Sequence, residues 1–181
     1  MESANHRRRA SGVTLVELMV VIAIVASLMM MAAPSYRSVT SSNRIAAEID
    51  GLLGDLQFAR VEAIKQGQPV VVCVSADGAQ CANSTNWQSG WIVFADLNGN
   101  GAPDAGETVL RVQRPFVGTD TFQASNNVTA VTFNREGLAI GIANGTLITL
   151  HESTHMSTFT RCLSVSMVGL MEVQTYGGAC T

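Results

Sequence analysis

The sequence predicts an α+β fold in which one long N-terminal helix packs on antiparallel β-sheet. A helical pattern of apolar residues extends from about Val13 to Lys65, and short β-branched or aromatic runs follow Pro69. Glycine, asparagine, aspartate and serine separate those runs, as expected for turns between strands. A helix followed by a series of strands is typical of the α+β class.

The first element is a basic leader followed by an apolar stretch. Three consecutive arginines precede Gly12, and the next 21 residues (13–33) carry one charge, Glu17. At about 1.5 Å per helical residue, this stretch spans roughly 30 Å, the thickness of a bilayer's hydrocarbon core. Because the basic cluster lies on the N-terminal side, the positive-inside rule keeps residues 1–12 in the cytoplasm and exports the other end.

Glu17 is unusual for such a stretch. A cleavable secretory signal has a shorter apolar core without a carboxylate. An ordinary membrane anchor would not place Glu17 five residues into its apolar run, where a carboxylate costs up to a few kcal/mol without a partner. The sequence therefore predicts that Glu17 has a partner.

Gly12, the following Val-Thr-Leu-Val-Glu run and Pro34 near the end of the apolar helix resemble the class III signal of type IV pilins and type II secretion pseudopilins. Val13 stands where the family usually has Phe or Met. The resemblance implies cleavage after Gly12 by a prepilin peptidase, methylation of the Val13 nitrogen, and polymerisation through the helix. The new α-amine of one subunit can then pair with Glu17 of its neighbour, which satisfies a buried charge.

The helix is expected to continue through residues 34–66 as an amphipathic segment. Gln66, Gly67 and Pro69 supply a stop signal. Gly51 and Gly54 are interpreted as positions of close packing against a sheet, and the alternative is a hinge that bends the helix. The apolar residues fall at helical spacing on one face: Ile45, Ile49, Leu52, Leu53, Leu56, Ala59, Ala63 and Ile64.

Residues 67–181 are predicted to form a β-rich globular head with two small sheets. Its strand-like runs are 70–75, 90–95, 108–113, 128–133, 146–150, 159–166 and 169–175. Four cysteines lie in this part of the chain, which suits an oxidising compartment.

Four runs in the head are similar to the domain shared by FimT and FimU type minor pilins and the H pseudopilins of type II secretion. They are the Cys73–Cys81 segment, residues 87–94, residues 96–101 and residues 133–137, and the two C-terminal cysteines follow them. The resemblance implies a pilin-like lollipop and a minor pilin that initiates or caps a type IV pilus. An H-type pseudopilin is the alternative, and no enzymatic activity is expected.

The same resemblance implies which partners the protein has and where in the cell it lies. The partners are other minor and major pilins, the prepilin peptidase and, before assembly, inner-membrane lipid. The head would lie in the periplasm while residues 13–33 cross the inner membrane, and at the cell surface once the subunit has entered a pilus.

With this family in view, the cysteines suggest two disulfides. The Cys73 to Cys81 spacing, with Asp77-Gly78 between them, suggests a bridge across a hairpin. Cys162 and Cys180 would then clamp the final hairpin to the C-terminus. Four cysteines allow three connectivities, so the other pairings stay open.

The segment from Asp96 to Glu107 matches a twelve-residue calcium loop. The positions that would supply ligands are Asp96, Asn98, Asn100, Ala102, Asp104 and Glu107. Flanking helices are not predicted, so the competing interpretation is an acidic Asn-Gly turn. Calcium is therefore a candidate ligand with weak expected affinity, and no other cofactor is predicted.

His151, Glu152 and His155 match the His-Glu-x-x-His pattern of zinc proteases. That chemistry requires a helix, which places both histidines on one face with the glutamate beside a metal-bound water. The flanking residues favour strands and a turn instead. We interpret the segment as a polar loop and not as a zinc site.

Nucleic acid is not expected as a partner. Without its leader the chain has 8 basic and 13 acidic residues, whereas DNA affinity comes largely from neutralising phosphates. Some FimT relatives are implicated in DNA uptake through a basic segment near the C-terminus. The matching residues 166–175 contain Glu172 and no lysine or arginine. The apolar side chains of Met167, Leu170 and Met171 are interpreted as core, and the alternative is an adaptable apolar contact for a neighbouring subunit.

Overall fold

The computed structural model describes residues 12–143, 145–151, 157–178 and 180, and only the backbone for residues 31–35 and 37. Its elements are the helix α1 (Leu15–Gln66) and the strands β1 (Val70–Val74), β2 (Trp91–Ala95), β3 (Val109–Gln113), β4 (Thr121–Ala124), β5 (Ala130–Phe133), β6 (Ala139–Ile140), β7 (Thr146–His151), β8 (Arg161–Val165) and β9 (Met171–Thr175). Short 3-10 helices cover Trp87–Ser89, Ser125–Asn127 and Ser157–Phe159.

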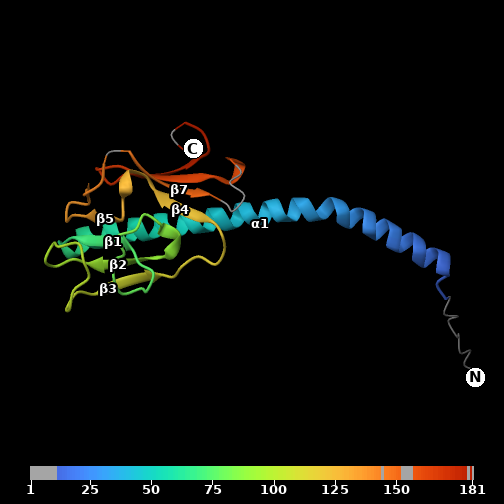
Figure 1. Ribbon diagram of the computed structural model, residues 1–181, viewed down its shortest axis with the longest axis horizontal. Coiled ribbons are helices and arrows are strands. Elements are labelled where there is room, and N and C mark those ends of the chain that lie inside the picture. Colours follow the sequence, from blue (N-terminus) through green and yellow to red (C-terminus); the bar gives the residue numbers. More distant parts are fainter. Residues whose placement is uncertain (1–11, 144, 152–156, 179, 181) are drawn as a thin grey trace, which may run out of the picture. The chain divides into compact units, whose positions relative to one another are not determined.

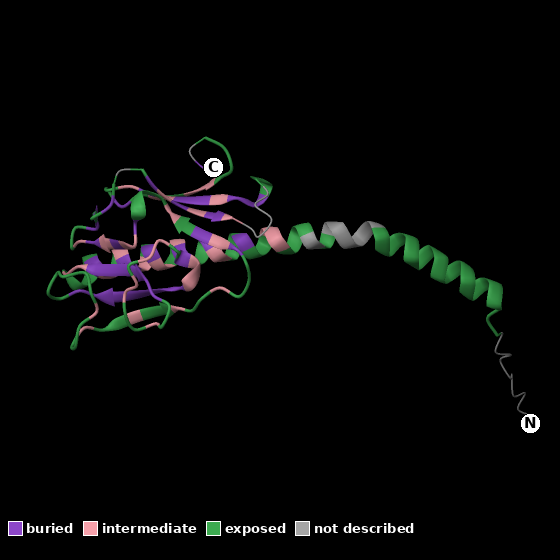
Figure 2. Cartoon of the chain, viewed as in Figure 1, coloured by how far each residue is buried: buried purple, intermediate pink, exposed green. Residues whose placement is uncertain are grey.

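Contacts divide the chain into two units, with the boundary between Thr40 and Ser41. This boundary falls inside the predicted segment 34–66, and the boundaries drawn from the sequence remain predictions. In Figure 2 the described residues of the first unit are exposed, whereas the buried residues gather in the second unit.

Among the residues whose structure is described, no helix is both long enough and apolar enough to cross a membrane. The span predicted at 13–33 includes residues 31–33, whose side chains lie outside the described set. That span therefore stays a prediction.

In the second unit, one face of α1 is fully covered. Its buried side chains are Ile45, Ile49, Leu52, Leu56, Ala59 and Ala63, spaced three or four residues apart as the sequence pattern predicts. Ile64 is 52% exposed and does not belong to this face. The helix ends where predicted, because Gly67 has φ +67° and its N–H bonds to the Ala63 carbonyl.

The packing interpretation of Gly51 and Gly54 is wrong. Both are exposed, and a Cβ built at either position would meet no heavy atom within 4 Å. They lie on the outer side of the helix, so close approach to a sheet is not the reason that glycine occupies them.

The strands form two antiparallel sheets, a five-stranded sheet in the order β3-β2-β1-β5-β6 and a four-stranded sheet in the order β4-β7-β8-β9. Figure 1 shows strands of both sheets lying along the C-terminal part of α1. In the centre of the larger sheet, Val72 of β1 stands opposite Val93 and Val131. The predicted α+β class with two small sheets is confirmed.

Both sheets share one core with the helix. Val70, Val72 and Val74 alternate towards it from β1, and Ile148 and Leu150 do so from β7. Aromatic rings fill one end of this core: Trp87, Trp91, Phe116 and Phe122 pack with centroids 5.7–6.4 Å apart. The core therefore fixes the position of α1 residues 45–63 against both sheets.

The outer face of the larger sheet carries a second, smaller cluster. Val71, Cys73, Ile92 and Phe94 are completely buried there, and Cys81 packs against them. The loops after β1 and β2 meet over this face, where the Cys81 sulfur lies 3.8 Å from the Gly101 carbonyl oxygen. These two loops thus cover an apolar sheet face that would otherwise meet water.

Candidate processing and assembly site

Helix α1 begins directly after the predicted cleavage point. Residues 12–14 are not helical, and the Thr14 hydroxyl accepts a hydrogen bond of 3.2 Å from the Glu17 backbone N–H. The Leu18 N–H donates to the Thr14 carbonyl at 3.1 Å and closes the first helical turn. Thr14 and Glu17 stand in the spacing of a capping box, which sets the start of a helix. The Gly12–Val13 peptide bond therefore lies outside the helix.

The groups that the processing chemistry needs are exposed. Gly12 and Glu17 are exposed, and Val13 is 71% exposed. Within the described residues, the Glu17 carboxylate makes no hydrogen bond or ion pair. A peptidase can reach the Gly12–Val13 bond, and the Glu17 carboxylate remains available to a second molecule.

The helix that follows is apolar on all sides. Its exposed side chains include Leu15, Val16, Leu18, Met19, Val20, Val21, Ile22, Ile24, Val25, Leu28, Met29 and Met30. A helix that is apolar all round requires lipid or other protein around it. This surface is the part of the described chain best suited to burial in an assembly.

The predicted calcium loop is closed by hydrogen bonds from its own backbone. Asp96 is 2% exposed, and its carboxylate accepts N–H groups of Gly99, Asn100 and Gly101 at 2.9–3.1 Å. Glu107 accepts the Leu97 N–H at 2.8 Å. Hydrogen bonds within the loop therefore explain its shape.

Asp104 is bound inside the same loop. The side-chain amides of Asn98 and Asn100 donate to its carboxylate at 2.8 and 2.6 Å, and these bonds lower the Asp104 pKa. In the part of the chain that is described, no three His, Cys, Asp or Glu side chains are grouped to hold a metal ion. Ala102 would contribute only its backbone carbonyl, and calcium binding stays a prediction.

His151 is the last residue of strand β7, so the helix that the zinc-protease pattern requires is not present at its first ligand. Its Nδ1 lies 3.2 Å from the Thr160 hydroxyl. Glu152 and His155 lie outside the described residues.

The cysteines form the two disulfides expected from the resemblance, Cys73–Cys81 and Cys162–Cys180. The first joins strand β1 to the loop over the outer face of the larger sheet. The second joins strand β8 to the C-terminal segment.

The core interpretation of Met167 and Leu170 is wrong. These side chains are 49% and 65% exposed, whereas Met171 packs partly against the core. They lie in the tight turn between β8 and β9, which Gly169 makes with φ +75°. A turn at this position directs the apolar side chains outward, which the sequence pattern did not show.

One feature of the head was not predicted. On α1, Arg44 donates two hydrogen bonds to Asp120 at 2.6 and 2.9 Å, and Glu48 lies one turn further along. The Glu48 Oε2 atom is buried and has no hydrogen-bond partner among the described residues. Burial, and secondarily Asp120, raises the Glu48 pKa to about 7, although Arg44 opposes the shift. Its position beside the apolar stripe was the only sequence signal.

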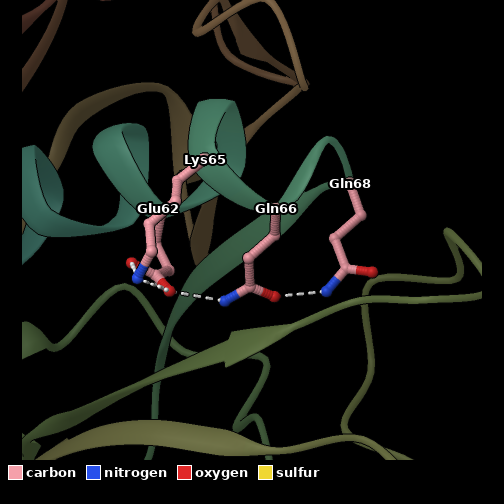
Figure 3. Close-up of polar contacts among 4 residues, drawn as sticks. All are labelled: Glu62, Lys65, Gln66 and Gln68. Carbon is pink, nitrogen blue, oxygen red and sulfur yellow. Dashed lines mark hydrogen bonds and ion pairs between the residues drawn. The ribbon is translucent and has the colours of Figure 1, made fainter.

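At the C-terminal end of α1, a second glutamate has the opposite environment (Figure 3). Glu62 accepts hydrogen bonds from Gln66 at 2.7 Å and from Lys65 at 3.2 Å. These contacts, Gln66 first, lower its pKa. Gln68 continues the chain of contacts by donating to Gln66. Glu62 is thus a carboxylate whose hydrogen bonds are supplied by its neighbours, on the same helix as Glu48.

Two protein-family models match the chain. The model described as "Type II transport protein GspH" matches residues 48–169.

The chain belongs to the GspH family.

The second model, "Prokaryotic N-terminal methylation motif", matches residues 7–33, which include Gly12, Val13 and Glu17. The GspH region includes most of the packed face of α1, the loop from Asp96 to Glu107, and both Glu48 and Asp120. No match is found among curated proteins.

Solved structures share the fold of this GspH-family chain. The crystal structure of the type IV minor pilin FimU of Pseudomonas aeruginosa (strain PAO1) in space group P21 is similar with a TM-score of 0.60 and 21% identity, covering 74% of this chain and 90% of FimU. The FimU structure in space group P65 gives a TM-score of 0.52 and 19% identity, covering 76% and 92%. The expected pilin-like fold is therefore confirmed.

Proposed function

We propose that this GspH-family chain is a minor pilin that initiates or caps a type IV pilus. The observation that carries the proposal is the start of α1: an exposed Gly12–Val13 bond lies before a capped helix that is apolar on all sides. The N-terminal methylation motif matches this segment, and the head has the fold of FimU, a type IV minor pilin. The role is structural, and no enzymatic activity is assigned.

In this proposal a prepilin peptidase cleaves after Gly12 and the Val13 nitrogen is methylated. Before assembly, residues 13–33 cross the inner membrane and the head lies in the periplasm. Afterwards the helix enters the filament core beside other minor and major pilins, and the head reaches the cell surface. The Val13 amine of one subunit pairs with Glu17 of another, so that neither charge is buried alone.

The test is the substitution Glu17→Ala, with Glu62→Ala as a matched control on the same helix. Both variants should be cleaved normally, because the Gly12–Val13 bond is unchanged. Filaments sheared from cells should contain the control at wild-type level and at least about tenfold less of Glu17→Ala, as expected for an unpaired buried charge. Normal incorporation of Glu17→Ala would contradict the pairing.

An H-type pseudopilin of a type II secretion system is the second candidate, because the matching family model carries that description. The two candidates share processing and helix chemistry, so Glu17→Ala does not separate them. Deletion of the gene does: a minor pilin predicts lost piliation with normal secretion, and a pseudopilin predicts the reverse.

A further inference from the structure

In the second unit, a groove lies between α1 and the turn that joins β8 to β9. It has a volume of about 330 Å³, at the lower end of the range of about 300–1,000 Å³ for small-molecule sites. Its lining residues are Gln57, Arg60 and Val61 of the helix, followed by Gly169, Leu170 and Met171 of the turn and β9. The groove therefore has room for a side chain of a partner and not for a large cofactor.

The walls of this groove are apolar and open to solvent. Val61 and Leu170, which line it from opposite sides, are 60% and 65% exposed. Met167 and Val168 of the same turn are 49% and 62% exposed. Apolar side chains that gather at one place on a surface mark an interaction site, whereas scattered ones do not. The groove therefore favours a partner that brings an apolar side chain.

Hydrogen bonds hold the groove in shape without a partner. The Arg60 Nε donates to the Gly137 carbonyl at 2.9 Å, and its Nη2 donates to the Val168 carbonyl at 3.3 Å. The Ala139 N–H donates to the Met167 carbonyl at 3.0 Å, so the turn before β6 lies beside the turn before β9. The guanidinium is thus already positioned, which lowers the ordering cost of binding.

Arg60 has no carboxylate partner within the part of the chain that is described. Both of its acceptors are neutral carbonyls, and none of the ion pairs includes it. Glu62 on the same helix is paired with Lys65, and Glu136 beside the Gly137 turn is paired with Arg135. A guanidinium has more N–H donors than two bonds use, and it always carries its charge. The complementary group for this groove is therefore an anion.

We propose that the groove is the docking site for an acidic and apolar segment of another pilin subunit. A carboxylate of that segment pairs with Arg60, and an adjacent side chain of leucine size packs between Val61 and Leu170. A small inorganic anion would leave the apolar walls exposed, and a purely apolar segment would leave Arg60 without a counter-charge. Carboxylates also match the planar guanidinium in geometry. This inference rests on the proposed function only for the source of the segment.

The test uses the full chain in maltoside micelles, with ¹³C-labelled methionine methyl groups, and the probe peptide acetyl-Leu-Asp-amide. The readout is the NMR signal of the Met171 methyl group in the groove, assigned with a Met171→Leu variant. The probe should shift this signal saturably with a millimolar Kd. The uncharged peptide acetyl-Leu-Asn-amide should bind roughly fivefold more weakly, as expected for the loss of one partly exposed ion pair.

Two pairs of variants make the test specific. Gln57→Glu places a carboxylate of the chain itself one helical turn before Arg60, so it should weaken probe binding roughly fivefold by competition. Gln80→Glu makes the same change of charge outside the groove and should leave the Kd unchanged. Leu170→Ser removes an apolar wall and should weaken binding roughly fivefold, whereas Val117→Ser, at a 96% exposed position outside the groove, should not. All four positions are exposed, so the fold should be retained.

The proposal is overturned by any of three results: no saturable shift in the wild-type chain, equal binding of the two peptides, or an unchanged Kd in Gln57→Glu. Two further outcomes would overturn it by naming another occupant. Hexyl phosphate that binds more tightly than the acidic peptide would indicate a lipid head group. A Met171 shift that grows with chain concentration in the absence of peptide would indicate a second copy of this chain.

The outcome is separate from that of the proposed function. Because the probe replaces the other subunit, a negative result leaves the pilin role standing. Conversely, probe binding by a chain whose gene deletion leaves piliation intact would retain the groove and remove the pilin subunit as its partner.

Discussion

At the scale of single residues, Glu48 and Glu62 show how one helix holds two carboxylates in different states. The Glu62 side chain is partly buried and hydrogen-bonded, and its pKa is lowered. Glu48 is partly buried beside Asp120, and its pKa is raised to about 7. The sequence presents both as glutamates on an amphipathic helix, because the Glu48 pKa depends on burial and on the charge of Asp120, which lies far away along the chain.

The raised pKa of Glu48 makes the stability of the folded chain depend on pH. Between pH 4.5, the ordinary value, and about 7, the unfolded chain loses the Glu48 proton and the folded chain keeps it. Stability should therefore fall as the pH rises through this window. Glu48→Gln should remove the fall, with a gain in Tm at pH 8 on the order of 2–4 °C per kcal/mol relieved and little gain at pH 4.5. Thermal melts at both pH values measure it.

Glu62→Gln is the control for that series. It removes a hydrogen-bonded carboxylate whose pKa is lowered, so it should not raise the Tm at pH 8. Equal behaviour of the two variants across pH would show that Glu48 is not the group responsible.

Asp96 gives a second prediction at this scale. Both of its oxygens accept backbone N–H groups, one of them from Gly101. Asp96→Asn turns one acceptor into a donor that faces an N–H, so it should destabilise the head by about 1–3 kcal/mol. Denaturant unfolding measures this loss of unfolding free energy, and a chelator in the buffer removes calcium from the comparison.

Repeating the Asp96 experiment in millimolar calcium tests the calcium hypothesis. A rise in wild-type Tm that Asp96→Asn abolishes would establish the loop as a calcium site. No rise would leave the loop as an acidic turn held by its own hydrogen bonds.

At the scale of elements, the long helix and seven of the strands could be predicted from the sequence. Helix α1 runs from Leu15 to Gln66, within two residues of the predicted limits. Strands β4 and β6 were missed. β4 is a Thr-Phe-Gln-Ala run with one large apolar residue in polar surroundings, and β6 has two residues. Such strands are set by pairing with neighbours and not by a local pattern.

The N-terminal site was predictable because its residues are adjacent in the chain. The surroundings of Glu48 were not, because they combine α1 with Asp120, which lies far away along the chain. Position in the sequence alone cannot show that Arg44 and Asp120 meet. For the same reason the exposed turn at Met167 and Leu170 was mistaken for core.

Two glycine turns, at Gly137 and Gly169, hold the end of α1 against the sheets. Arg60 donates to the Gly137 carbonyl at 2.9 Å and to the Val168 carbonyl at 3.3 Å. A Cβ at Gly169 would lie 2.5 Å from the Gly137 carbonyl oxygen, and its φ is +75°. These contacts leave no room for a side chain at Gly169.

Gly169→Ala should therefore cost more than about 2 kcal/mol, the sum of left-handed backbone strain and a backbone clash. Gly141→Ala is the matched control, since Gly141 has φ +77° but no atom within 4 Å of a built Cβ. It should cost only the strain, about 1–2 kcal/mol. If urea unfolding gave the same loss of unfolding free energy for both variants, the clash at Gly169 would add nothing to the backbone strain.

At the scale of the whole molecule, the two units require different surroundings. The second unit has its own core and both disulfides, whereas residues 15–30 of the first expose apolar side chains. A chain of residues 41–181 should therefore fold as a soluble monomer, and the full chain should need detergent. Circular dichroism melts and gel filtration check this. Aggregation or a loss of cooperative unfolding would show that the head depends on the N-terminal half of α1.

The apolar outer face of the larger sheet has a consequence for the order in which the head is completed. Cys81 packs against the cluster of Val71, Ile92 and Phe94, and its loop is tied down through Cys73–Cys81. Under reducing conditions the disulfide no longer holds that loop, and the apolar sheet face is exposed to non-specific association. Chain produced recombinantly in a reducing cytoplasm should therefore aggregate unless it is oxidised, and this side of the head should be completed only where the Cys73–Cys81 bridge can form.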